Sequence, residues 1–149
     1  MEFQHPVGSN CDARGSDHGP APFAANIVCE AGQNRNFRTA FWTGCHFQMT
    51  LMSIPVCGEI GVEMHPDTDQ LIRVEAGYAL VCMGDCRERL DFQRRLSTGD
   101  AVFVPGGTWH NILNAGNCPL KLSSIYAPPQ HSRETVHRTK ADAAANEKY

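Results

Sequence analysis

The sequence lacks the features that direct a chain to a membrane, a secretory route or a nucleic acid. Its 149 residues contain no apolar run near the roughly 18 residues that span a bilayer. The N-terminus has no basic segment followed by an apolar core, as a signal peptide has. Lys and Arg number 13 against 16 Asp and Glu, and only Arg94 and Arg95 are adjacent basic residues. We therefore expect a cytoplasmic protein with no membrane and no nucleic-acid partner.

The seven cysteines contain no CxxC pair, and their number is odd. Without a secretory signal they predict reduced thiols and no disulfide framework. The spacing of Cys82 and Cys86 does not suit a tetrahedral cysteine zinc site, so we expect both to be packed thiols. Cys57 has no acid–base partner in the sequence around it, and we expect it to be unreactive.

Short segments rich in β-branched and aromatic residues recur along the chain with turn residues between them. We predict strands at 26–30, 37–43, 46–54, 61–65, 70–75, 78–83, 86–96, 101–104, 110–113 and 120–126. About ten strands with no intervening helix predict an all-β sandwich or barrel. Residues 1–22 are predicted to be a flexible N-terminal segment, 23–130 the barrel, and 131–149 a C-terminal tail with a short helix that Thr139 caps.

Glu63 and His65 are two residues apart in the predicted strand 61–65, so both side chains project from one face. Burying a carboxylate and an imidazole together is costly unless a partner such as a divalent cation is present. If Gln70 points inward, Ile72 and Val74 share its face as an apolar lining, whereas Arg73 and Glu75 face water.

A strand that ends in Pro105-Gly106-Gly107 leads to His110, and this stretch resembles a known motif. Gly99, Pro105, Gly107, His110 and Asn114 match every fixed position of the second motif of the cupin family. The first cupin motif also aligns, with substitutions, when its positions are counted back from Gly77. Its ligand positions fall on Glu63, His65 and Gln70, and its leading glycine falls on Cys57.

The resemblance, over about residues 45–127, implies a cupin-type antiparallel β-barrel (a double-stranded β-helix or jelly roll) with a short C-terminal helix. It implies one divalent metal ion (Zn, Fe, Mn, Co or Ni) held by Glu63, His65, Gln70 and His110, and a homodimer. Small single-domain cupins of this kind are often named mannose-6-phosphate isomerase-like. The alternative is a degenerate cupin in which these four side chains form a hydrogen-bond network without metal.

Two classes of function follow from these expectations. The first is a metal-dependent enzyme acting on a small organic molecule, with isomerase, lyase or dioxygenase chemistry. The second is a non-catalytic cupin that binds or senses a small ligand. Phosphosugar isomerisation needs a cationic group near the metal, and no Lys or Arg is clearly directed inward, whereas dioxygenation needs only the metal and an apolar cavity.

Other residues are candidates for a pocket around this site. His46 and Gln48 either line the pocket or face solvent, and Tyr126 with residues 127–131 could cover its mouth. His131 and His137 with Arg133, Arg138 and Lys140 could bind an anion, although a solvated tail is the simpler interpretation. Asp67 and Asp69 are expected to hydrogen-bond turn amides. We expect a core role for five large side chains: Trp42, Phe47, Met52, Phe103 and Trp109.

Overall fold

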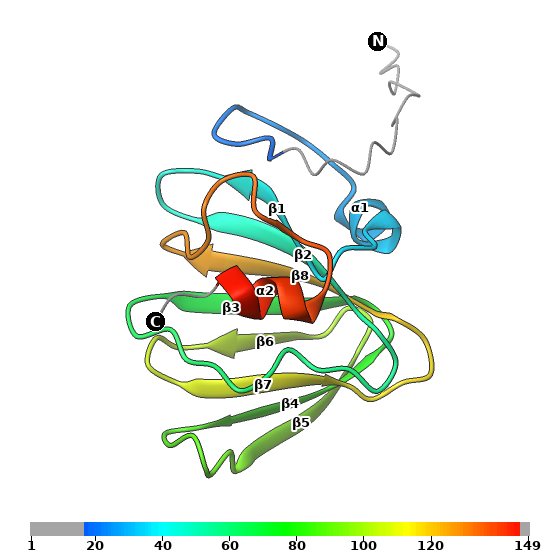
Figure 1. Cartoon of the computed structure of the whole chain (residues 1–149), viewed down its shortest axis with the longest axis vertical. Helices are drawn as coiled ribbons and strands as arrows, with labels where there is room; N and C mark the ends of the chain where they lie inside the picture. Colours follow the sequence, from blue (N-terminus) through cyan, green and yellow to red (C-terminus); the bar gives the residue numbers. More distant parts are fainter. Residues whose placement is uncertain (1–16, 147–149) are drawn as a thin grey trace.

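The structure is a computed structural model that describes residues 17–146. Figure 1 shows strands stacked along the long axis, with a short helix near each end of the described chain. The helices are α1 (Ile27–Gln33) and α2 (Lys140–Asn146). The strands are β1 (Arg38–Thr43), β2 (Gln48–Ile54), β3 (Asp69–Ala76), β4 (Tyr78–Gly84), β5 (Phe92–Ser97), β6 (Ala101–Val104), β7 (Trp109–Asn114), β8 (Leu120–Ala127) and β9 (Val136–His137).

The strands form two antiparallel sheets. The larger has the order β6-β3-β8-β2-β1-β9 and the smaller the order β5-β4-β7. Alternate side chains of both sheets point inward and bury an apolar core that includes Met52, Ile72, Val74, Val81 and Ile112. The expected all-β jelly roll with a C-terminal helix is confirmed.

The prediction of a strand at 26–30 is wrong, because α1 occupies this stretch. The Asn26 side chain caps the helix by accepting from the backbone amide of Cys29 at 3.1 Å. The helix packs on the outer face of the larger sheet, where Ala31, Phe41 and Leu51 form a second, smaller core. The cap therefore outweighs the β propensity of Ile27 and Val28.

The prediction that Glu75 faces water is also wrong, because Glu75 lies on this covered outer face. Glu75 is 3% exposed. Its carboxylate accepts from Arg73 Nη1 at 2.7 Å and from Ser123 Oγ at 2.7 Å. Its charge is thus buried with a cation and a hydroxyl beside it, and only Arg73 reaches solvent.

The predicted C-terminal helix is present as α2. The Thr139 hydroxyl accepts from the Asp142 amide, and the Asp142 carboxylate accepts from the Thr139 amide. This reciprocal capping fixes the start of the helix. Ala143 is 3% exposed and packs against the inner core, so α2 covers part of that core.

Two predicted strands are shorter than expected, and one strand was not predicted. Residues 61–65 form only an isolated bridge at Glu63, and 86–89 form a tight turn before β5. β9 pairs with β1 through Arg38 and His137, although the 131–149 region was expected to be a tail. A two-residue strand carries too little periodic pattern to be read from sequence.

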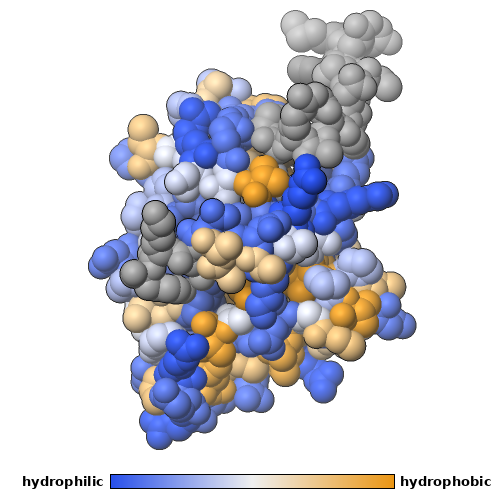
Figure 2. All heavy atoms as spheres, viewed as in Figure 1, coloured by the Kyte–Doolittle hydropathy of each residue, from blue (hydrophilic) through white to orange (hydrophobic). Residues whose placement is uncertain are grey.

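The surface in Figure 2 shows hydrophobic side chains in small groups among hydrophilic ones. Met52 is in the core as predicted, but Phe103 is 69% and Phe47 is 42% exposed, so their predicted core roles are wrong. Trp42 and Trp109 are only half-buried. None of the helices in the described chain is long and apolar enough to cross a membrane.

The predicted flexible segment 1–22 falls mostly on residues 1–16, which lie outside the described residues. Residues 17–22 lie against β1 and do not trail over the surface. The Asp17 carboxylate accepts from the backbone amide of Thr43 at 2.9 Å, and the His18 amide donates to the Phe41 carbonyl at 2.9 Å. These contacts hold the stretch against the end of the larger sheet.

Candidate metal centre

Glu63 and His110 lie directly opposite each other on two neighbouring backbone segments. The Glu63 amide donates to the His110 carbonyl and the His110 amide donates to the Glu63 carbonyl, both at 2.9 Å. Residues that exchange both backbone bonds across an antiparallel pair present their side chains on the same face. The bridge therefore brings a carboxylate and an imidazole from the two motifs together.

The turn before β7 fixes the position of His65 relative to this pair. Gly107 donates its amide to the His65 carbonyl at 2.8 Å, and Gly106 donates to the Asp69 carboxylate at 2.8 Å. The expected role of Asp69 in hydrogen-bonding a turn amide is confirmed. Gly107 has a φ of 82°, a conformation that favours glycine.

Cys57, at the leading glycine position of the first motif, has a φ of 64°. A non-glycine residue in this left-handed region carries backbone strain. The backbone at Cys57 therefore keeps the conformation that suits the glycine of the first motif. The Cys57 side chain is exposed, in the loop after β2.

Glu63, His65 and His110 form one cluster whose ligand atoms all lie within 4.8 Å of one another. Glu63 Oε1 is 3.6 Å from His65 Nε2 and 3.5 Å from His110 Nε2. Two ligand atoms each about 2.1 Å from one tetrahedral ion lie about 3.4 Å apart, so these separations suit a shared cation. The expected convergence of these three residues is confirmed.

The protonation pattern also fits a metal. His110 Nδ1 is 2.9 Å from the Thr108 carbonyl. A carbonyl only accepts, so Nδ1 carries the proton and Nε2 is the ring nitrogen that could ligate a metal. His65 Nε2 and His110 Nε2 are both buried without a hydrogen-bond partner. Buried polar atoms left unsatisfied are rare, and a bound ion explains both of these.

Gln70 lies on β3, and its side chain is buried on the same face as Ile72 and Val74, as predicted. Its Nε2 donates to Ser124 Oγ at 2.7 Å. This bond leaves the amide oxygen, Oε1, buried without a partner. An amide ligates a metal through its oxygen, and this oxygen is free of other bonds; direct ligation by Gln70 stays a prediction.

The environment of Glu63 keeps its carboxylate ionised. Burial alone raises the pKa of this carboxyl, but the imidazoles of His110 and His65 and the guanidinium of Arg38 bring the pKa well below its usual range. As metal ligands, the cluster would offer two imidazoles and one carboxylate charge. This donor set suits divalent transition metals.

The other wall of the site is built around Tyr126. Its ring lies 5.8 Å from that of His65 and 5.2 Å from that of His131, both edge to face. Gln48 is fully buried and holds the backbone of His131: Nε2 donates to the His131 carbonyl and Oε1 accepts from its amide, each at 2.9 Å. Both residues thus contact His131, which lines the cavity, and Gln48 fixes its backbone; a pocket role for Tyr126 and Gln48 themselves stays a prediction.

His46 does not join them. It is exposed in the bend between β1 and β2, so the pocket role offered for it is not supported. His131, which was treated as part of a solvated tail, is instead packed on Tyr126. Burial, with Arg38 nearby, lowers the pKa of His131 to about 3, so its imidazole is neutral at physiological pH.

Arg38 is a candidate site residue that sequence reasoning missed. It is 1% exposed on the inner face of β1. Its Nη1 is 3.3 Å from His137 Nδ1, and its Nε is buried without a partner. The inward-facing cation that the sequence did not reveal is thus present. We call the buried polar group of Arg38, Thr50, His65, Tyr126 and His131 the polar chamber.

A cavity of about 1110 Å³ opens onto the cluster. Its lining includes Glu63, His65, Trp109, His131 and His137, and Arg87 stacks over the Trp109 ring at its rim. The space is ample for a small organic molecule beside the ligands.

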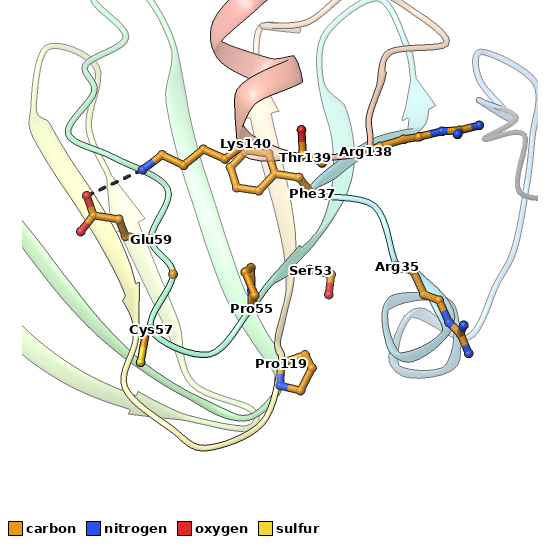
Figure 3. Close-up of a pocket in the computed structure, with 11 residues that line it drawn as sticks. Arg35, Phe37, Ser53, Pro55, Cys57, Glu59, Pro119, Arg138, Thr139 and Lys140 are labelled. Carbon is orange, nitrogen blue, oxygen red and sulfur yellow. Dashed lines mark ion pairs between the residues drawn. The ribbon is translucent and has the colours of Figure 1, made fainter.

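A second cavity of about 460 Å³ lies between the loop after β2 and the start of α2 (Figure 3). Arg35 and Arg138 extend away from its centre, and Lys140 reaches Glu59 at 3.8 Å. Arg133 donates to the Gly19 carbonyl. The suggested anion site combining these basic residues with His131 and His137 is therefore not assembled.

A model of the cupin domain, Cupin_2, matches residues 50–126, which contain all four candidate ligands. The chain belongs to the cupin family. The chain is 55% identical over 131 residues to YrkC of Bacillus subtilis, covering 88% of this chain and 70% of YrkC. It is 37% identical over 110 residues to protein L612 of Acanthamoeba polyphaga mimivirus, covering 73% and 67% of the two chains.

Solved structures show the same cupin architecture. The crystal structure of BH2720 from Bacillus halodurans superposes with a TM-score of 0.86 at 56% identity, covering 87% of this chain and 98% of that one. KdgF from Halomonas sp. superposes with a TM-score of 0.56 at 19% identity, covering 62% and 80%, which shows a shared fold alone.

Proposed function

We propose that this cupin is an enzyme that holds one divalent ion through Glu63, His65 and His110, with Gln70 as a fourth ligand, and acts on a small organic molecule in the adjoining cavity. The observation that carries the proposal is the set of unpartnered ligand atoms. His65 Nε2, His110 Nε2 and Gln70 Oε1 are all buried, and none has a hydrogen-bond partner. Keeping them unsatisfied costs stability, which a bound ion would restore.

The lining of the site favours isomerase or lyase chemistry over dioxygenation. A bound ion would act as a Lewis acid on a carbonyl or hydroxyl oxygen. Next to His65, through the ring of Tyr126, the polar chamber holds hydrogen-bonding groups: Arg38, Thr50, Tyr126 and neutral His131. Dioxygenation was expected to rely on an apolar lining, and the apolar side chains Ile72 and Val74 lie further along β3, among the core residues.

Elemental analysis of protein purified without added metal tests the first half of this proposal. We expect close to one transition-metal ion per chain, lost on treatment with a chelator. Oxygen-consumption assays after reloading with Fe(II) test the second half. We expect no oxygen uptake with small hydroxy- and keto-compounds; steady uptake with one of them would instead establish dioxygenase chemistry.

The Gln70→Leu variant tests whether the amide ligates. Leucine removes a buried unsatisfied oxygen, so we expect the metal-free protein to be as stable as the wild type or more stable. If Gln70 ligates, the variant binds Zn(II) about 10- to 100-fold more weakly in a competition titration with a chromophoric chelator. Unchanged affinity would show that Gln70 only supports Ser124.

The competing function is a non-catalytic cupin that binds or senses a small ligand. The metal cluster and the cavity are compatible with it. Binding of a candidate compound without its conversion, followed by NMR of the mixture, would favour this alternative. The mannose-6-phosphate isomerase-like name stays a prediction, tested by the same NMR assay with that sugar phosphate.

A cytoplasmic location is part of the proposal. Five of the six cysteines within residues 17–146 are exposed, and all six are free. Exposed unpaired thiols are typical of a reducing compartment. Only Cys82 is buried, so the expectation that Cys86 is a packed thiol is wrong.

A further inference from the structure

His131 is a histidine on the cavity of the metal cluster that is not one of the candidate ligands. The cavity of about 1110 Å³ that contains Glu63 and His65 is also lined by His131. The Nε2 atom of His131 is buried and has no hydrogen-bond partner. Buried polar atoms are nearly always satisfied, and leaving one unpaired costs stability. His131 thus carries an unsatisfied nitrogen on a cavity with room for a ligand.

A series of buried side chains holds the backbone of His131 in place. Gln48 is 0% exposed, and it bonds both the amide and the carbonyl of His131. Gln48 Nε2 also donates to the Thr43 hydroxyl at 2.9 Å, and that hydroxyl donates to the buried Asp17 carboxylate. Polar networks whose members are all satisfied are rigid. The fold therefore uses three buried polar residues to fix the position of one residue after β8.

Aromatic contacts hold the His131 ring as well. Its ring lies 5.2 Å from that of Tyr126 and 6.3 Å from that of His137, both edge to face. The Tyr126 ring lies 5.8 Å from that of His65. His131 and His65 therefore pack against the same tyrosine and line the same cavity. They are close enough for one small molecule to contact both.

The imidazole of His131 is uncharged at physiological pH. Burial, with Arg38 and His137 nearby, lowers its pKa to about 3. A neutral imidazole has one nitrogen that donates a hydrogen bond and one that accepts. A hydroxyl group can both donate and accept, so it suits either nitrogen, whereas a carboxylate only accepts.

Most of the remaining lining of the cavity is uncharged too. Of the side chains that line it within the described chain, Glu63 is the one carboxylate, and Arg87 is the one Lys or Arg, stacked over the Trp109 ring at the rim. The other polar side chains that line it, besides the histidines, are amides and hydroxyls: Gln130, Ser132, Thr135 and Asn146. Such groups suit a ligand that carries hydroxyl and carbonyl oxygens without a charge of its own.

We propose that His131 is a ligand-binding residue of this site, and that its Nε2 hydrogen-bonds to a hydroxyl group of a small, uncharged hydroxy-carbonyl compound. This inference rests on the proposed function, in which the ion binds an oxygen atom of the same molecule. It adds the chemical class of the ligand and a binding role for a residue outside the metal cluster.

NMR of Zn(II)-loaded protein with ¹⁵N-labelled histidines tests this inference. The probes are dihydroxyacetone and acetone, which has the carbonyl group but no hydroxyl group. We expect dihydroxyacetone to bind and to shift the ring-nitrogen signal of His131, and acetone to leave that signal unchanged.

Three variants test the role of the imidazole, with affinities taken from backbone-amide shifts. His131→Phe keeps a ring against Tyr126 but has no nitrogen, so it should bind dihydroxyacetone about 10-fold more weakly or less well still. His131→Gln restores a hydrogen-bonding group and should recover part of the affinity. The exposed His46 supplies the matched control His46→Phe, which should bind dihydroxyacetone as the wild type does.

An unshifted His131 signal, equal binding of acetone and dihydroxyacetone, or wild-type affinity in His131→Phe would overturn the inference. Zinc content and circular dichroism of each variant separate loss of the ion or of the fold from loss of the contact. Should a variant not fold, the signal of the wild type decides the question. If the wild type takes up no zinc, the proposed function fails. Titration of the metal-free protein then decides the inference alone: dihydroxyacetone binding that shifts the His131 signal supports it, and absence of binding refutes it.

Discussion

Replacing His110 with alanine separates metal binding from structural stability. A ligand present at 100 times its dissociation constant stabilises the folded state by about 2.7 kcal/mol. For a chain of this length that corresponds to a rise in melting temperature of about 5 to 11 °C. We expect Zn(II) to produce such a rise in the wild type and none in His110→Ala, measured by differential scanning calorimetry with and without a chelator.

The structure also sets the expected stability of the metal-free variant. His110→Ala loses the hydrogen bond from Nδ1 to the Thr108 carbonyl, about 1 kcal/mol, and removes the unsatisfied buried Nε2, which relieves about 1 to 3 kcal/mol. The space left by the ring opposes that relief, so the metal-free melting temperatures should lie close together. The exposed His46 provides the control His46→Ala, which should keep the full zinc response. A zinc response retained by His110→Ala would refute the assignment.

Three further predictions concern the wall of the chamber and the sheet edge. Gln48→Leu removes three hydrogen bonds of 2.9 Å and should lower the free energy of unfolding by about 3 kcal/mol in urea titrations. A loss under about 1 kcal/mol would contradict the role of Gln48 in holding the backbone of His131. His131 has a folded pKa of about 3, below the value of 6.5 in the unfolded chain, so the unfolded state gains protons first on acidification. The free energy of unfolding of the metal-free wild type should therefore fall by about 2 kcal/mol between pH 7 and pH 5, and that of His131→Asn should lack this fall. If urea titrations give the same fall for both proteins, the prediction is contradicted. We propose that two copies pair through β6, an edge strand whose Phe103 is 69% exposed. Light scattering should then show a dimeric wild type and a monomeric Phe103→Asp variant. A monomeric wild type would contradict this pairing.

The strands and the metal cluster could be predicted because their signals are local. Alternation along β3 correctly placed Gln70, Ile72 and Val74 on the inner face. The turn glycines and His110 stand at fixed spacing, since the turn must dock on the backbone of His65. The same local reasoning placed Glu63 and His65 together although residues 61–65 form no regular strand.

The chamber could not be predicted, because its contacts join residues far apart in sequence. Both faces of β1 are buried, so alternation did not show on which side Arg38 lies. Its partner His137 is 99 residues away and lies on a strand of two residues. Glu75 was misplaced for a related reason: the helix that covers its face was itself predicted as a strand.

A crystal of the protein soaked in Zn(II), with anomalous differences collected across the zinc edge, would show whether Glu63, His65 and His110 hold one ion. We expect one strong peak about 2.0 to 2.2 Å from His65 Nε2, His110 Nε2 and a Glu63 carboxylate oxygen. Strong peaks only at surface residues, with these three side chains bound to one another or to water, would contradict it.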